Sequence, residues 1–146
     1  MDDSKATRSG LDSLREHIAT WHTAGMPKTL DMHLVELAEG KAVLEGRPTA
    51  RFYNAQGRVH GGYAAALIDD AMGCAVRTKL PQSVGFGTIE MNVSYVRKLD
   101  AESGKLLCEA TVLHAGRTLF TVEAKVTDKE GKLCAHGSGT FLIYPK

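Results

Sequence analysis

The most restrictive feature of this sequence is the segment from Gly62 to about Leu80, which is apolar on nearly every side of a predicted helix. A helix of this composition has to be buried, because a surface helix carries a polar face. The segment follows His60-Gly61, and glycine at such a start allows a sharp turn or the close approach of another backbone. The first amide groups of a helix lack partners within it and lie at its positive end, where an oxyanion is stabilised.

Two adjacent carboxylates interrupt this apolar helix. At about 100° per residue, Asp69 shares a stripe with small and apolar residues, namely Gly62, Ala65, Ala66, Gly73 and Val76. Asp70 points toward the side that carries Tyr63, Cys74 and Arg77. We therefore expect Asp69 to lie in a confined, poorly solvated spot and Asp70 to have an easier route to solvent. A carboxylate in such a spot, near an oxyanion-binding helix start, is typical of a catalytic site.

The segments on either side of this helix alternate apolar and polar residues, as strands do. We predict a hairpin of Met32–Leu37 and Lys41–Arg47, followed by loop 48–59, the helix and loop 81–87. Four further strands are predicted at Thr88–Arg97, Lys105–His114, Thr118–Thr127 and Lys132–Tyr144. Short connections favour pairing between consecutive strands. The fold class is therefore α+β, with an antiparallel sheet wrapped around a single long helix.

The N-terminal part of the chain has a different pattern. Residues 1–10 are polar, and we expect them to be frayed. Apolar residues at helical spacing predict a short amphipathic helix from Leu11 to His22, with His17 and His22 on its solvent side. We divide the chain into an N-terminal extension, residues 1–30, and one domain, residues 31–146.

Composition excludes several classes of function. The 146 residues carry 18 basic and 17 acidic side chains, so the net charge of +1 shows no excess of basic residues that would indicate nucleic-acid binding. No apolar run reaches the roughly 18 residues that span a bilayer. Three widely spaced cysteines, Cys74, Cys108 and Cys134, predict buried thiols in a reducing compartment, hence a cytoplasmic protein without a disulfide frame. No spacing of metal ligands is present.

One spacing carries a family resemblance. His60-Gly61-Gly62, with an acid nine residues after the histidine, resembles the motif of hotdog-fold acyl-CoA thioesterases, of the PaaI-like and 4-hydroxybenzoyl-CoA group. Asn54, six residues before His60, stands where the family has Asn or Gln. The segments 88–95 and 116–119 resemble the family's next strand and a later turn. The resemblance extends from about Leu34 to Ile143, and it implies the hotdog fold.

The resemblance also implies roles for individual residues. Asp69 would be the nucleophile or the general base that activates water, and the sequence does not choose between them. The Gly61 N–H would polarise the thioester carbonyl. Asn54 would hold the water or the carbonyl, Thr88 would help to hold the water, and His60 would fix the loop or line the carbonyl pocket. Each of these residues also has a purely structural explanation. Asp69 could be an acid whose partner is a neighbouring group, Gly61 a glycine that the turn needs, and Asn54 a turn residue. Thr88 could be a residue that favours a strand, and His60 a structural histidine.

The implied substrate is an acyl-CoA, so coenzyme A is part of the substrate and no cofactor is expected. We expect substrate contacts from Gly62, Tyr95, His114, Gly116, Arg117 and Thr118, with Arg97 and Lys98 as further candidates for the phosphates. The 4-hydroxybenzoyl type has a hydroxyl residue where this chain has Gly73, which favours the PaaI-like arrangement. The apolar helix and Phe86 favour an aromatic or medium-chain acyl group.

The family builds its active site between the subunits of a homodimer, so we expect a homodimer and its assembly into a homotetramer. Two alternatives remain open at this stage. One is a noncatalytic acyl-CoA-binding module, which could dispense with the acid. The other is a hotdog dehydratase or hydratase, which uses a different His and acid motif.

Overall fold

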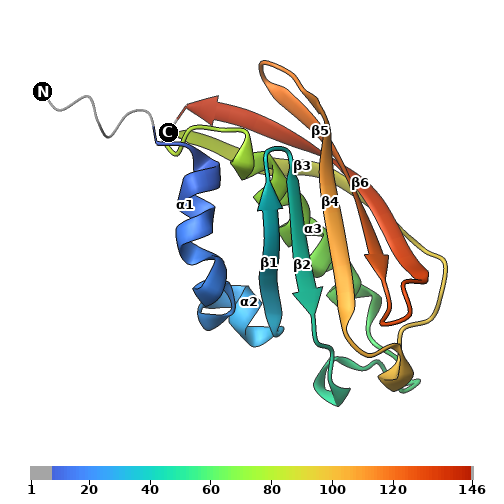
Figure 1. The fold of residues 1–146 in the computed structure, drawn as a ribbon. Helices are drawn as coiled ribbons and strands as arrows, with labels where there is room; N and C mark the ends of the chain where they lie inside the picture. The colour runs from blue at the N-terminus through green and yellow to red at the C-terminus, as the bar shows by residue number, and fades with distance from the viewer. Residues whose placement is uncertain (1–7, 146) are drawn as a thin grey trace, which may run out of the picture.

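A six-stranded antiparallel sheet forms the frame of the protein in the computed structural model, which describes residues 8–145 (Figure 1). The strands stand in the spatial order β1-β2-β4-β5-β6-β3. Their bounds are β1 Met32–Ala38, β2 Lys41–Gly46, β3 Val84–Tyr95, β4 Leu106–Ala115, β5 Leu119–Thr127 and β6 Leu133–Pro145. All six predicted strands are present, and the α+β class with the hotdog architecture is confirmed.

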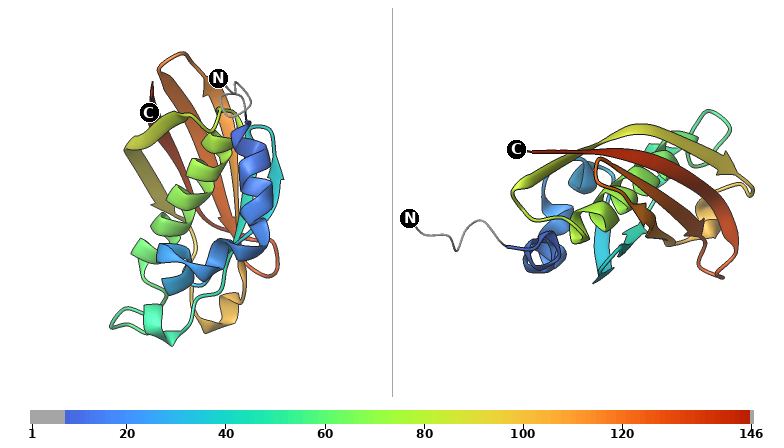
Figure 2. Two further views of the ribbon diagram at one scale, coloured as in Figure 1. Left: turned by 90° about the vertical axis from the view of Figure 1, so that its left-hand side faces the viewer. Right: turned by 90° about the horizontal axis from the view of Figure 1, so that it is seen from above.

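The helix α3, Gly61–Thr78, lies along the concave side of this curved sheet (Figure 2). Leu67, Ile68 and Met72 on its inner face are fully buried against the sheet. The outer face is not buried in the single chain, since Ala65, Asp69 and Gly73 stay partly exposed. The prediction that the helix is covered all round is therefore wrong for this face, because a single sheet covers only one side of a helix.

Strand β3 pairs with β6 at the far edge of the sheet, and the predicted order of consecutive neighbours is wrong at this point. The connection from β3 to β4 contains a 3-10 helix, η4 Ala101–Ser103, and carries the chain across the end of the sheet. Strand β4 then pairs with β2, which joins the first hairpin to the later strands. The pairings of β1 with β2, β4 with β5 and β5 with β6 are as predicted.

The N-terminal segment packs against α3 and against the edge strand β1 (Figure 1). It contains α1 Gly10–His17, the 3-10 helix η2 Ile18–Thr23 and α2 Gly25–Thr29, where we expected one helix over 11–22. The expected fraying lies mostly outside the described residues, and it is wrong for residues 9 and 10. Ser9 caps α1, and the Gly10 N–H donates to the Leu80 carbonyl at 2.8 Å.

Two smaller differences concern loops. Strand β3 begins at Val84, so the expected loop 81–87 is shorter and Phe86 belongs to a strand. The expected loop 48–59 contains the 3-10 helix η3, Ala50–Phe52.

The three cysteines are free and buried, as predicted. In the described part of the chain, no helix is long and apolar enough to cross a membrane.

Candidate active site

The start of α3 is held by the side chain of His60. Its Nδ1 accepts a hydrogen bond from the Gly62 N–H at 3.1 Å, so a neutral imidazole carries its proton on Nε2. The His60 carbonyl accepts from the Tyr63 N–H at 2.9 Å. Among residues 8–145, the Gly61 N–H finds no hydrogen-bond partner. It is therefore a free donor at the positive end of the helix.

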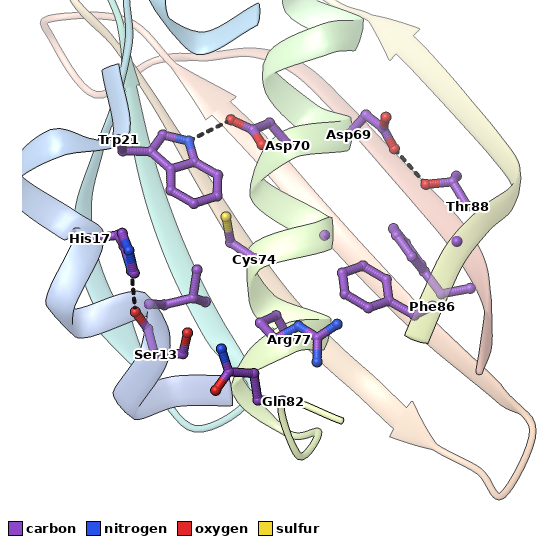
Figure 3. A pocket seen from close by; sticks show the side chains of 14 residues that line it. Ser13, His17, Trp21, Asp69, Asp70, Cys74, Arg77, Gln82, Phe86 and Thr88 are labelled. Carbon is purple, nitrogen blue, oxygen red and sulfur yellow. Dashed lines mark hydrogen bonds between the residues drawn. The ribbon is translucent and has the colours of Figure 1, made fainter. Parts of the chain in front are cut away.

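Asp69 and Thr88 lie side by side, although they come from α3 and from β3. The Thr88 hydroxyl donates to Asp69 Oδ1 at 2.8 Å (Figure 3). Thr88 is exposed and Asp69 is partly exposed in the single chain. This hydrogen bond fixes one carboxylate oxygen and leaves the other oxygen for a second partner.

Asp70 lies in the opposite direction and is the more enclosed of the two carboxylates. Its Oδ2 accepts a hydrogen bond from the Trp21 indole N–H at 2.9 Å. Burial raises the pKa of Asp70, and the neighbouring charge of Asp69 adds to this, while the Trp21 hydrogen bond opposes it. The expected contrast, with Asp69 confined and Asp70 open to solvent, is therefore reversed. The reason is that η2 covers the Asp70 side of the helix.

A hollow of about 520 Å³ separates the N-terminal segment from β3, with α3 as its floor (Figure 3). We call it the Asp69 hollow. It is lined by Ser13, Leu14, His17, Trp21, Asp69, Asp70, Gly73, Cys74, Arg77, Gln82, Phe86, Gly87, Thr88 and Phe141. Apart from its charged groups, the hollow offers aromatic and aliphatic surface beside the Asp69 carboxylate. Such a hollow fits an apolar group attached to a reacting carbonyl.

A second hollow, of about 360 Å³, lies at the beginning of α3. We call it the Gly61 hollow, and its lining is Asn54, Gln56, Arg58, Val59, Gly61, Tyr95, Val96, Arg97, Lys98 and Leu99. The Tyr95 hydroxyl donates to the Gly61 carbonyl at 2.7 Å. Asn54 Oδ1 accepts from the Gln56 and Arg58 amides at 2.9 and 3.2 Å, so its oxygen holds the loop. Only the amide NH₂ of Asn54 remains for a ligand.

The predicted catalytic residues are thus split between the two hollows of one chain. Asp69 and Thr88 meet in one, and Asn54 and Gly61 line the other. Asp69 follows Gly61 by eight residues, which is about 12 Å along the helix axis at 1.5 Å per residue. One thioester carbonyl cannot contact both groups at that separation.

The predicted substrate residues are divided as well. Gly62 is exposed at the beginning of α3, and Tyr95, Arg97 and Lys98 line the Gly61 hollow beside it. The other four predicted contacts lie where β4 passes into β5, since His114 is near the end of β4 and Gly116, Arg117 and Thr118 form the turn that follows. The register places this turn toward the other end of the sheet, because Leu119 pairs with Leu142, which also pairs with Gly87.

Several residues of the Asp69 hollow had no predicted role there, among them His17, Trp21 and Arg77. Trp21 is one of the apolar residues at helical spacing between Leu11 and His22, and the sequence carries no signal for its contact with Asp70, 49 positions away. Among the described residues, no group of three or more His, Cys, Asp or Glu side chains is arranged to hold a metal ion.

Comparison with known proteins decides the family. Residues 56–135, more than half of the chain, match the sequence model of the Thioesterase superfamily. The chain belongs to this family. The resemblance that the His60 motif suggested is confirmed, and so is the class of thioester hydrolase at the level of the family.

Three relatives and one solved structure illustrate the match. A putative esterase of Halobacterium salinarum is 40% identical over 61% of this chain, and the alignment spans only 62% of that protein. The 1,4-dihydroxy-2-naphthoyl-CoA hydrolase of Listeria monocytogenes is 27% identical over 84% of this chain and 98% of its own length. Human acyl-coenzyme A thioesterase 13 is 33% identical over 73% of this chain and 76% of its own length. The E. coli PaaI structure, from the phenylacetic acid degradation operon, superimposes with a TM-score of 0.78 at 21% identity, over 89% and 91% of the chains, and shows the shared fold.

Proposed function

We propose that this protein hydrolyses an aromatic or medium-chain acyl-CoA to the free acid and coenzyme A, with Asp69 as the nucleophile or the general base. The observation that carries the proposal is the Asp69 carboxylate, held by Thr88 at 2.8 Å beside a hollow of about 520 Å³. The family and its named relatives supply the class of reaction.

Hydrolysis needs an oxygen nucleophile and donors for the charge that develops on the carbonyl oxygen. The Asp69 oxygen that Thr88 leaves free attacks the thioester carbon or removes a proton from the attacking water. In the first route the coenzyme A thiolate leaves as a mixed anhydride forms on Asp69, and water then hydrolyses the anhydride to the free acid and the Asp69 carboxylate. In the second route the water oxygen adds to the thioester carbon while Asp69 takes its proton, and the thiolate then leaves and takes up that proton. Thr88 keeps the carboxylate in one orientation, which favours either route.

The Gly61 N–H is proposed to come from a second copy of the chain. It is an unpartnered donor at a helix start, but it lies about 12 Å along the same helix from Asp69. A dimer that sets the Gly61 hollow of one subunit against the Asp69 hollow of the other would bring donor and acid to one carbonyl. In that arrangement the Asn54 amide and His60 Nε2 are the remaining donors near the reacting atoms.

The exposed edge of the sheet supports this dimer. Strand β3 is an edge strand of 12 residues, with Ile89 and Tyr95 more than half exposed. Natural proteins rarely leave a long edge of this kind unpaired. We propose that two copies join through this edge, and that dimers assemble further into a homotetramer.

Coenzyme A is proposed to lie near Arg97 and Lys98, two basic residues that line the Gly61 hollow. Cations suit the phosphate groups of the cofactor portion. The second candidate surface is the end of β4 with the turn that follows it, which carries His114, Gly116, Arg117 and Thr118. Three buried free thiols suit a reducing compartment, which supports a cytoplasmic location.

The acyl group is proposed to enter the Asp69 hollow. Phe86 and Phe141 supply apolar wall, and their ring centroids lie 6.1 Å apart. The Listeria relative is named for an aromatic acyl-CoA, which supports an aromatic group here as well. Burial of each methylene is worth about 0.8 kcal/mol, so acetyl-CoA should be the poorest substrate of a series.

A free-thiol assay with acetyl-, hexanoyl- and phenylacetyl-CoA tests this function. We expect Asp69→Asn to lower kcat by about a hundredfold or more with little change in KM, since the lost group acts in the chemical step. Asp70→Asn is the matched control, because its amide oxygen still accepts from Trp21 and most activity should remain. Binding of acyl-CoA without hydrolysis, a preference for acetyl-CoA, or loss of activity only in Asp70→Asn would contradict the proposal.

A further inference from the structure

The Asp69 hollow has a wall that does not come from the sheet and central helix. Ser13, Leu14, His17 and Trp21 line it from α1 and η2, and Phe86 faces them from β3 (Figure 3). The floor between these walls is α3, from Asp69 to Arg77. A group attached to a carbonyl at Asp69 would therefore pass between an indole and a phenyl ring.

The indole of Trp21 is fixed at its polar end. Its N–H donates to Asp70 Oδ2 at 2.9 Å, and its ring packs against the hydrophobic core. A donor held by a carboxylate makes a stronger hydrogen bond than one held by a neutral group. The side chain thus has one orientation, and the ring presents a fixed surface to the hollow.

The facing wall and the floor are equally well defined. The Arg77 guanidinium lies over the Phe86 ring at 4.7 Å from its centroid, and Arg77 Nη1 donates to the Pro81 carbonyl at 2.9 Å. Gly73 forms the floor beside Phe86, where an added Cβ would lie 3.7 Å from the ring. The glycine therefore leaves the space next to the phenyl ring free.

We propose that Trp21 is the residue that selects the acyl group, and that Asp70 acts as its positioning residue. Two aromatic walls over a glycine floor favour a flat aromatic acyl group over a flexible chain of similar carbon number, because stacked or edge-on rings add to the burial of apolar surface. This inference rests on the proposed thioesterase function and assigns its acyl specificity to the N-terminal segment.

Kinetics with phenylacetyl-CoA and hexanoyl-CoA test the selection. Trp21→Ala should lower kcat/KM for phenylacetyl-CoA about tenfold and for hexanoyl-CoA less than threefold, since the flexible chain loses less contact. Trp21→Phe keeps a ring and should retain most of the preference. Asp70→Ala removes the anchor and should weaken the preference in the same direction as Trp21→Ala.

His22→Ala is the matched control from the same 3-10 helix. His22 stacks on His33 at 4.2 Å between ring centroids and does not line the hollow, so the ratio of the two kcat/KM values should stay unchanged. Equal losses for both substrates in Trp21→Ala would overturn the inference. Failure of the unmodified enzyme to hydrolyse either substrate would instead overturn the proposed function, so the two failures are distinct.

Fluorescence gives a readout that does not depend on turnover. Trp21 is the only tryptophan of the chain, and Asp69→Asn should keep phenylacetyl-CoA intact during a titration. We expect the emission of Trp21 to shift with phenylacetyl-CoA and to stay unchanged with coenzyme A alone. Unchanged emission at concentrations where calorimetry detects binding of phenylacetyl-CoA would contradict the assignment of Trp21 to the acyl site.

Discussion

The carboxylates of Asp69 and Asp70 leave α3 in different directions and meet different neighbours. Asp69 meets a hydroxyl from the sheet edge, and Asp70 meets an indole from the N-terminal segment. A carboxylate beside solvent and substrate can take part in chemistry, whereas one enclosed under an indole can hold that indole in place. The positions of their partners therefore assign different tasks to two identical side chains.

The pKa of Asp70 gives a prediction for stability. Folding raises this pKa, chiefly through burial, so the folded chain binds the proton more tightly than the unfolded chain. The free energy of unfolding then falls as the pH rises from below the ordinary aspartate range to above the raised pKa. Asp70→Asn cannot ionise, so at about pH 7 its Tm should exceed that of the wild type by a few degrees.

Thermal melts of both proteins across the acid range check this. The difference in Tm should shrink as the pH falls, and at about pH 3, where the carboxyl group is protonated in both states, it should be absent. A difference that stays constant with pH would mean that Asp70 affects stability through packing alone.

At the residue scale, the sequence was enough to predict which residues share the site, because their spacing along the chain shows this. It was not enough to predict how far each carboxylate is buried. The count from His60 selected Asp69, the family resemblance assigned Thr88 to the same site, and these two side chains do meet. The expected burial of Asp69 and exposure of Asp70 was wrong, because the helical wheel describes one helix and contains no information on what covers each side. The N-terminal segment decides this, and it contacts Asp70 from 49 positions away.

At the scale of elements, α3 depends on the N-terminal segment for the cover of its Asp70 side. The segment enters at Gly10, where α1 begins against the end of α3. A Cβ at Gly10 would collide with the Arg77 carbonyl oxygen and lie 2.7 Å from the Leu80 carbonyl oxygen. Glycine is thus required here for the close approach of two backbones.

Gly10→Ala should lower the free energy of unfolding by about 1–3 kcal/mol, the usual cost of overpacking. Gly87→Ala is the matched control, since its added Cβ meets nothing within 4 Å and its effect should stay within about 0.5 kcal/mol. Denaturant unfolding of the two variants measures the contrast. Equal stability of the two variants would show that the α1 contact with α3 adapts without cost.

The elements themselves were predictable because their patterns are local. Alternation gives all six strands within a few residues, and the apolar run gives α3 from Gly61 to Thr78. The early start of β3 was missed because Gly85 and Gly87 resemble loop residues, although β3 pairs them with Tyr144 and Leu142 of β6. A glycine in a strand can be told from a loop glycine only when the partner strand is known.

At the scale of the whole molecule, the order of strands was only partly predictable. Hairpins follow from short connections, but the partner of β3 depends on where residues 96–105 travel, and they cross the end of the sheet. This path makes β3 an edge strand. The same path brings Tyr95, Arg97 and Lys98 beside Gly61.

The central claim is that Asp69 of one subunit acts together with the Gly61 turn of another. Mixing two inactive variants tests it. Asp69→Asn disables one half of each site, and Asn54→Asp disables the other while keeping oxygens for the Gln56 and Arg58 amides. Random exchange of subunits should restore about a quarter of the wild-type sites, since each mixed dimer holds one site with both halves intact.

The measurement is the rate of free-thiol release from phenylacetyl-CoA before and after subunit exchange, with mixed dimers counted by native mass spectrometry. The account predicts that activity rises in proportion to the fraction of mixed dimers, toward about a quarter of the wild-type rate. Mixed dimers that form while activity stays at the sum of the two inactive variants would contradict a site shared between subunits.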